Sequence, residues 1–136
     1  AVIFGDQAGL VGLDLPQTRV KAGEQLSLTL HWQAITTLDT SWKVFVHLVN
    51  DEGEIVTKKD QIPGAGQFPT TGWLPDEYLT DSYSLLIPAD TPPGQYWLEI
   101  GLYDANDLHF PRLSVVEEGE IISDHIFLEN WPISVE

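Results

Sequence analysis

Hydrophobic and polar residues alternate along much of this chain, in short runs separated by Gly, Pro, Asp and Asn. Between Leu26 and Trp32 every second residue is apolar and the residues between them are polar, which is the period of a half-buried β-strand. The segment 96–102 repeats this alternation after the turn sequence Thr91-Pro92-Pro93-Gly94. Both segments are therefore predicted to be strands that turn their apolar face toward a core.

The segment 42–49 differs because it has apolar residues on both faces. Its even-numbered apolar residues share one face, whereas Phe45 and Val49 lie on the other. Such a strand is typical of the centre of a sheet that is covered on both sides. The turn residues 50–53 then predict a hairpin with a following strand at 54–59.

The whole chain is predicted to be an all-β protein. Further short strands are expected at 1–4, 10–15, 83–87 and 108–113, with one or two more in 121–135, for a total of about eight or nine. No segment keeps a helical spacing of apolar residues without a Pro or Gly. The pattern favours a single domain, 1–136, that folds as an antiparallel two-sheet β-sandwich, immunoglobulin-like or jelly-roll-like, with Greek-key connections. A closed barrel is the alternative.

One segment, about 61–80, breaks the pattern. It holds three Pro and three Gly residues and is predicted to be a long crossing loop, which in a sandwich often carries function. Aromatic side chains offer flat faces to a pyranose ring, and carboxylates accept hydrogen bonds from its hydroxyl groups. The predicted glycan-binding residues are Phe68, Trp73, Tyr78 and Asp81. The alternative is that Trp73 anchors the loop in the core and that Asp81 caps loop amides, in which case this surface does not exist.

The sequence holds little that indicates catalysis. It has no Gly-x-Ser-x-Gly motif, no closely spaced His pair and no Cys, so we expect no enzyme activity. With 21 acidic residues, a carboxylate pair at the spacing of a glycosidase has almost no specificity. Asp104, Asn106 and Asp107 are the candidate metal ligands, for calcium, and the alternative is that they only support a turn. No other cofactor is expected.

Charge narrows the range of partners. The chain has six Lys and Arg residues against 21 Asp and Glu residues, and the formal net charge is −15. Residues 69–136 hold 13 of the acidic residues and only one basic residue, Arg112. Such a chain is not expected to bind nucleic acid or to dock on anionic lipid. It contains no apolar run long enough to span a membrane, so we expect no direct membrane insertion. Because it has no Met, it is also expected to be a processed product or a domain excised from a larger protein.

Several motifs occur in a specific order. They are Gly23-Glu24-x-Leu26-x-Leu28-x-Leu30-x-Trp32-Gln33-Ala34, Val44-Phe45-Val46-His47-Leu48-x-x-Asp51-x-Gly53, Pro69-Thr70-x-x-Trp73-x-Pro75-x-Glu77, Asp81-x-Tyr83-x-Leu85 and Pro88-Ala89-Asp90-x-Pro92-Pro93-Gly94-x-Tyr96-x-Leu98-x-Ile100-Gly101-Leu102-Tyr103-Asp104. As a set, which spans about residues 4–135, they resemble the β-sandwich domain that follows the membrane region in many bacterial polytopic glycosyltransferases. Those proteins are similar to the dolichyl-phosphate-mannose mannosyltransferases. One departure is Asp76, where the family often has Gly.

This resemblance implies an extracytoplasmic, non-catalytic accessory domain. It would be tethered to the membrane region of the same polypeptide and lie near lipid-linked sugars, with glycan as the expected partner. A looser likeness is to sandwich domains that bind polysaccharide at the end of transport ATPases. The alternative function, from a different class, is a purely structural or protein-interaction domain without a ligand, with calcium as an added stabiliser.

Overall fold

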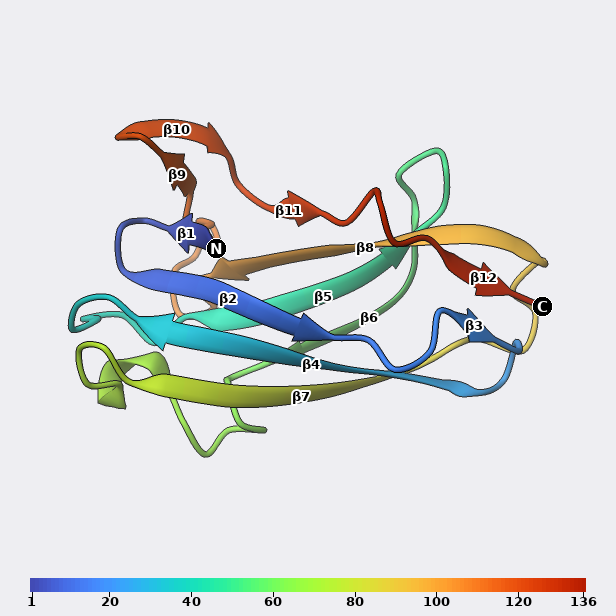
Figure 1. The fold of residues 1–136 in the computed structure, drawn as a ribbon, viewed down its shortest axis with the longest axis horizontal. Helices are drawn as coiled ribbons and strands as arrows, with labels where there is room; N and C mark the ends of the chain where they lie inside the picture. The colour runs from blue at the N-terminus through green and yellow to red at the C-terminus, as the bar shows by residue number, and fades with distance from the viewer.

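The structure, a computed structural model, describes residues 1–136, and its regular secondary structure is almost wholly β-strand (Figure 1). The strands are β1 (Val2–Phe4), β2 (Ala8–Asp14), β3 (Arg19–Val20), β4 (Gln25–Ala34), β5 (Lys43–Val49), β6 (Ile55–Gln61), β7 (Tyr78–Leu86), β8 (Gly94–Tyr103), β9 (Val115–Glu117), β10 (Glu120–Ser123), β11 (Ile126–Phe127) and β12 (Ile133–Val135). The one helical segment, η1 (Thr70–Gly72), is a single 3-10 turn. No helix is long and apolar enough to cross a membrane.

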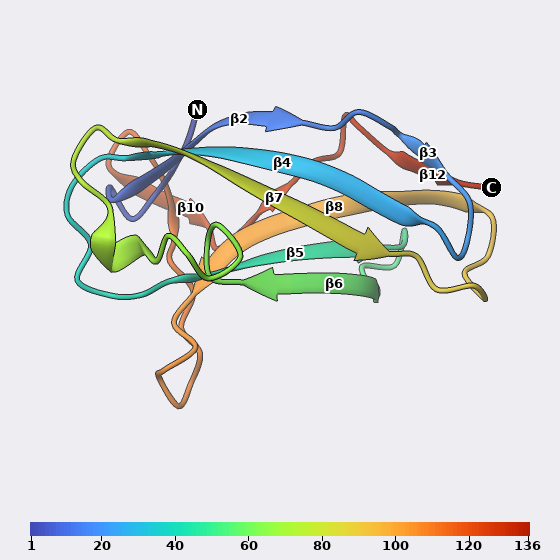
Figure 2. The ribbon, with the colours of Figure 1, turned by 90° about the horizontal axis from the view of Figure 1, so that it is seen from below.

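The strands form two sheets that pack face to face, as the alternation predicts. One sheet has the order β10-β9-β1-β2-β4-β7, and the other has the order β3-β12-β8-β5-β6, with β11 also paired to β8. All pairs are antiparallel except β3 with β12, which is parallel. Figure 2 shows the two layers from the side. The predicted fold class, an antiparallel two-sheet β-sandwich, is confirmed.

The core lies between the two sheets and contains the residues that the period-two pattern predicts. In β4 and β8 every second side chain is buried, from Leu26 to Trp32 and from Tyr96 to Leu102. The core forms one cluster of 25 buried residues drawn from both sheets. Burying apolar surface stabilises the fold by about 25 cal/mol for each Å² removed from water, so this cluster is the main source of stability.

Strand β5 is buried on both faces, as predicted. It lies between β6 and β8, and its Val44 and Val46 point into the core. On the outer face Phe45 and Val49 are each only 1% exposed. A two-layer sandwich has no third layer to cover Phe45, so this side chain must be covered by loops and by neighbouring side chains.

The predictions at the ends of the chain are less accurate. The structure has twelve strands instead of about eight or nine. Five of the twelve, β3 and β9 to β12, are very short and are therefore hard to predict from the sequence. The strand predicted at 108–113 is wrong, since this segment contributes only an isolated bridge between Tyr103 and Arg112. Short pairings of this kind depend on which backbone lies alongside and not on apolar alternation.

The long loop exists and runs over 62–77, so Tyr78 and Asp81 belong to β7. It closes one end of the sandwich (Figure 2). Asp76 has a φ of 67°, in the left-handed region that favours Gly. Asp tolerates this conformation better than most residues other than Gly, but with some strain.

Candidate functional site

The four predicted glycan-binding residues do not form one exposed surface. Phe68 and Tyr78 are exposed, but Trp73 is only 2% exposed and Asp81 only 1%. The Trp73 indole packs against Trp32 in the core with ring centroids 6.3 Å apart, and its Nε1 donates to the Phe68 carbonyl oxygen at 2.9 Å. The glycan surface predicted on the long loop is therefore corrected, because its central aromatic ring is used to anchor the loop.

Asp81 is occupied in a similar way by internal donors. Trp32 Nε1 and the Tyr83 hydroxyl donate to Oδ2, while Gln61 Nε2 and the Gly64 backbone N–H donate to Oδ1. Burial and the neighbouring Asp81 carboxylate raise the pKa of Tyr83 well above its ordinary value, so its hydroxyl stays a donor. Asp81 therefore caps a loop amide, as the alternative interpretation expects. Both of its oxygens accept hydrogen bonds from inside the protein, so neither is left for a sugar.

The candidate calcium ligands lie in the turn after β8. Asp104 Oδ1 accepts from the backbone N–H of Asn106 at 3.0 Å, and Asp107 Oδ1 accepts from that of His109 at 2.9 Å. No group of three or more His, Cys, Asp or Glu side chains in the structure is arranged to hold a metal ion. The arrangement is that of side chains supporting a tight turn, so the metal site stays a prediction without geometric support.

A different concave site lies on the outer face of the second sheet. We call it the outer-face pocket, and its cavity volume is about 570 Å³. Strands β5, β6 and β8 and the loop 104–114 supply its lining residues, which are Lys43, Phe45, His47, Lys58, Asp60, Tyr103, Ala105, Phe110 and Arg112. None of them was predicted as a site residue. The pocket combines aromatic rings with charged groups in an arrangement that suits a small hydroxylated ligand.

Aromatic rings form the floor of this pocket. The Phe45 ring lies 4.6 Å from the His47 ring and 6.3 Å from the Tyr103 ring, measured between centroids. Position 101 on β8 must be Gly, because a Cβ there would collide with the Phe45 ring. The missing side chain leaves the space that the Phe45 ring occupies against β8.

Loop 104–114 forms one wall through Phe110 and Arg112. The Phe110 ring meets the Tyr103 ring edge-on at 6.3 Å and remains 59% exposed. Its φ of 47° is unusual for a bulky residue and strains the backbone, and strained residues often occur at functional sites. The Arg112 guanidinium lies 4.4 Å above the Phe45 ring centroid, a cation–π contact that covers this buried ring.

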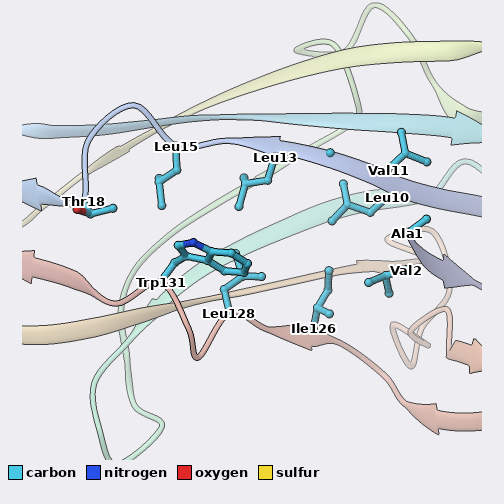
Figure 3. A pocket seen from close by; sticks show the side chains of 11 residues that line it. Ala1, Val2, Leu10, Val11, Leu13, Leu15, Thr18, Ile126, Leu128 and Trp131 are labelled. Carbon is cyan, nitrogen blue, oxygen red and sulfur yellow. The ribbon is translucent and has the colours of Figure 1, made fainter.

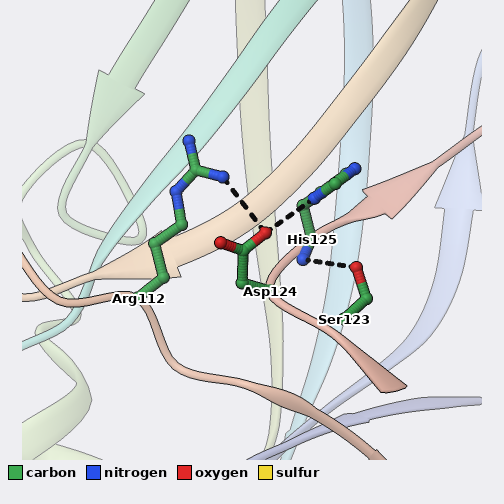
Figure 4. A network of polar contacts seen from close by, with 4 residues as sticks. All are labelled: Arg112, Ser123, Asp124 and His125. Carbon is green, nitrogen blue, oxygen red and sulfur yellow. Dashed lines mark hydrogen bonds and ion pairs between the residues drawn. The ribbon is translucent and has the colours of Figure 1, made fainter. Parts of the chain in front are cut away.

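Arg112 is held in place from behind (Figure 4). Its Nη1 donates to Asp124 Oδ1 at 3.3 Å, and the same oxygen lies 2.8 Å from His125 Nδ1. The hydrogen bond from His125 and the charge of Arg112 lower the pKa of Asp124, so this carboxylate is ionised at neutral pH. An ionised Asp124 orients the guanidinium over the pocket.

Asp60 forms the opposite wall on β6 and has a free oxygen. The Tyr103 hydroxyl donates to Oδ2 at 3.0 Å, whereas Oδ1 is buried and has no hydrogen-bond partner. Burial, together with the hydrogen bond to Asp60, raises the pKa of Tyr103 to about 12. Burial also lowers the pKa of His47, whose Nε2 lies 3.8 Å from Asp60 Oδ1. At neutral pH the pocket lining therefore contains a neutral imidazole and a phenol, and beside them an Asp60 side chain whose buried Oδ1 lacks a donor.

A second cavity is almost wholly apolar (Figure 3). This apolar cleft, of about 450 Å³, lies between β2 and the segment 126–131, with Leu13 and Leu15 on one side and Leu128 and the half-exposed Trp131 on the other. Strand β1 pairs only with residues 8–10 of β2, so the edge of β2 beyond Leu10 is unpaired along the cleft. Thr18 supplies the one polar side chain of the lining.

Comparisons with known proteins indicate the fold and not the function. The sequence matches no protein-family model and no curated protein. The structure is similar to the crystal structure of the C-terminal domain of wzt, with a TM-score of 0.61 and 11% sequence identity over 100% of this chain and 77% of that chain. It is also similar, with a TM-score of 0.49 and 13% identity over 96% of this chain and 94% of that chain, to the CARDB domain of the PF1109 protein from Pyrococcus furiosus in complex with di-metal ions. At these identities the likeness concerns the β-sandwich alone.

Proposed function

We propose that this chain is a non-catalytic glycan-binding module and that its outer-face pocket holds one pyranose unit. The observation that carries the proposal is the pairing, in one pocket, of aromatic rings with polar groups that lack partners. The Phe110 and Tyr103 rings offer apolar faces to the C–H groups of a sugar ring. Asp60 lines the same pocket and its Oδ1 has no hydrogen-bond partner, so a small rotation of this side chain would let it accept a hydrogen bond from a sugar hydroxyl group.

The proposal places the module outside the cytoplasm, tethered to the membrane region of a glycosyltransferase-like protein. The support for this setting is the order of the motifs between Gly23 and Asp104. The wzt structure is itself a C-terminal domain, which supports the view that this fold serves as one part of a larger protein. In that setting the module would hold a lipid-linked or growing glycan close to the membrane enzyme.

A catalytic role fits the pocket poorly. Glycoside hydrolysis needs two carboxyl groups on opposite sides of the scissile bond. Asp60 is the only carboxylate among the residues that line the pocket. Its lining also contains no Ser, Thr or Cys nucleophile beside His47. Binding therefore explains the arrangement better than chemistry does.

A glycan array tests the proposal with two matched variants of the same loop. Phe110→Ala removes the exposed wall of the pocket, whereas Leu108→Ala removes an 88% exposed side chain that lies outside it. We expect array signals that Phe110→Ala abolishes and Leu108→Ala retains. Signals that persist in Phe110→Ala would show that glycan binds at a site other than the outer-face pocket. If the unaltered protein gives no signal on the array, the glycan-binding proposal is wrong.

The second candidate function is protein interaction, which the apolar cleft favours. Its lining and the unpaired edge of β2 suit an extended apolar peptide segment better than a sugar. The same array separates the two functions, because an interaction domain gives no glycan signal at all.

A further inference from the structure

Basic residues are concentrated at the outer-face pocket in a chain that is otherwise strongly acidic. Lys43, Lys58 and Arg112 all line it, which is half of the six basic residues in a protein of net charge −15. Opposing them in the lining is only Asp60. The pocket lining therefore carries a net positive charge on an acidic molecule, although Asp124 pairs with Arg112 from outside the lining, and this local charge needs an explanation that the general solubility of the protein does not supply.

The positive charge is only partly neutralised within the protein. Lys43 takes part in none of the ion pairs of the structure. Lys58 Nζ lies 3.8 Å from Asp60 Oδ2, which is a long and partly exposed pair of small energetic value. Two ammonium groups at the pocket therefore remain available to an anionic ligand.

Arg112 adds a directional donor. Only its Nη1 is used for a hydrogen bond, to Asp124, so the remaining guanidinium N–H groups are not used within the protein. Arg presents its donors in a planar fork that matches a carboxylate with two parallel hydrogen bonds. The stacking on Phe45 and the bond to Asp124 limit the motion of this fork before a ligand arrives.

We propose that the pyranose unit held in this pocket is acidic, a uronic acid whose carboxylate faces Lys43, Lys58 and Arg112 while a ring hydroxyl donates to Asp60. This inference rests on the proposed glycan-binding function and specifies its ligand class. The carboxylate explains the three cations, and the hydroxyl explains the buried Asp60 oxygen that has no donor. A simple organic acid would leave Asp60 unpaired, and a neutral sugar would leave the cations without a role.

The probes are D-glucuronate, D-galacturonate and D-mannuronate, each compared with its own methyl ester. The ester keeps the ring and its hydroxyl groups but removes the charge. Binding is followed by the backbone amide NMR signals of Phe45, Tyr103 and Phe110. We expect at least one acid to shift these signals and its ester to bind on the order of tenfold more weakly. An ester that binds as well as its acid would overturn the inference.

Two variants of one strand separate the pocket from the general field of the protein. Lys58→Gln and Lys59→Gln each remove one positive charge from β6, but only Lys58 lines the pocket. We expect Lys58→Gln to weaken uronate binding several-fold and Lys59→Gln to leave it almost unchanged. An equal loss in both variants would show that only long-range charge is involved and would contradict a built carboxylate site.

The outcomes also distinguish the inference from the function on which it rests. If no uronate shifts the pocket signals while neutral array glycans do so, the acidic specificity is wrong and glycan binding stands. If neither uronates nor array glycans shift them, both proposals fail together.

Discussion

Loop 62–77 and loop 104–114 both carry aromatic side chains, but the long loop buries its Trp73 whereas the shorter loop exposes its Phe110. In the long loop Trp73 points inward against Trp32. In the shorter loop Phe110 points outward and remains more than half exposed. Figure 2 shows the same difference in the backbone, since the first loop closes the end of the sandwich and the second projects away from it.

The two loops also differ in what their polar contacts do. The long loop is tied to the rest of the fold, because the buried Thr70 hydroxyl donates to the Thr40 carbonyl oxygen and accepts from the Trp42 N–H. The shorter loop forms its turn mainly from its own groups, through Asp104 and Asp107. The comparison shows that a loop's length and aromatic content do not indicate function by themselves. A loop is free to bind a ligand only when its side chains are not used inside the fold.

The largest effect is expected at the carboxylate that supports the long loop. Asp81→Ala leaves the Trp32, Tyr83 and Gly64 donors without an acceptor in the interior, while Gln61 keeps only its bond to the Ser82 carbonyl oxygen, and we expect a loss of about 4 kcal/mol in the free energy of unfolding. Urea denaturation measures it. The exposed Asp90→Ala is the control and should change stability by less than about 0.5 kcal/mol. A small loss for Asp81→Ala would mean that the long loop is not anchored as described.

A direct comparison of the two loops uses one substitution in each. Trp73→Ala creates a cavity beside Trp32 and should destabilise the protein by about 3–4 kcal/mol. Phe110→Ala removes a largely exposed ring and should cost less than about 1 kcal/mol. Thermal and urea unfolding of both variants provide the measurement. Similar losses at the two positions would remove the distinction between an anchoring loop and a displayed one.

The strained backbone of the shorter loop predicts a smaller effect, which is a gain in stability when Gly and not Ala replaces Phe110. At a φ of 47°, Gly is favoured over other residues, so Phe110→Gly should be more stable than Phe110→Ala by about 1 kcal/mol. The difference is read from the two urea midpoints. Equal midpoints would indicate that residue 110 is not held in the left-handed conformation.

The smallest effect is the pH dependence that arises from His47. Burial lowers its folded-state pKa below the unfolded value of 6.5, so the unfolded chain binds the proton first as the pH falls. The contribution of His47 to stability is complete above pH 6.5 and decreases below it, toward the folded-state pKa. The charged groups that act on it are Asp60, Glu99, Lys58 and Arg112. The free energy of unfolding is measured at pH 7.5 and pH 5 in the unaltered protein and in His47→Gln. We expect the decrease between the two pH values to be smaller in the variant, and an equal decrease in both proteins would contradict this role of His47.

The sequence determines much of the sandwich because its signals are local. The alternation from Leu26 to Trp32 decides which face of β4 is apolar, and the same holds for the segment 96–102. The apolar residues on both faces of β5 likewise predict its central position. These patterns work because side chains in a strand point alternately to its two faces, whatever the strand pairs with.

The outer-face pocket is not encoded by any single segment, and only the tertiary structure shows it. Phe45, Asp60, Tyr103 and Arg112 come from separate parts of the chain and meet only when β5 pairs with both β6 and β8. The apolar Phe45 on the outer face and the isolated Arg112 were the available signals, but neither indicates a partner by itself. Whether Trp73 was a ligand platform or an anchor was likewise decided by the packing of distant residues, since exposure depends on the final position of the whole loop and not on its composition.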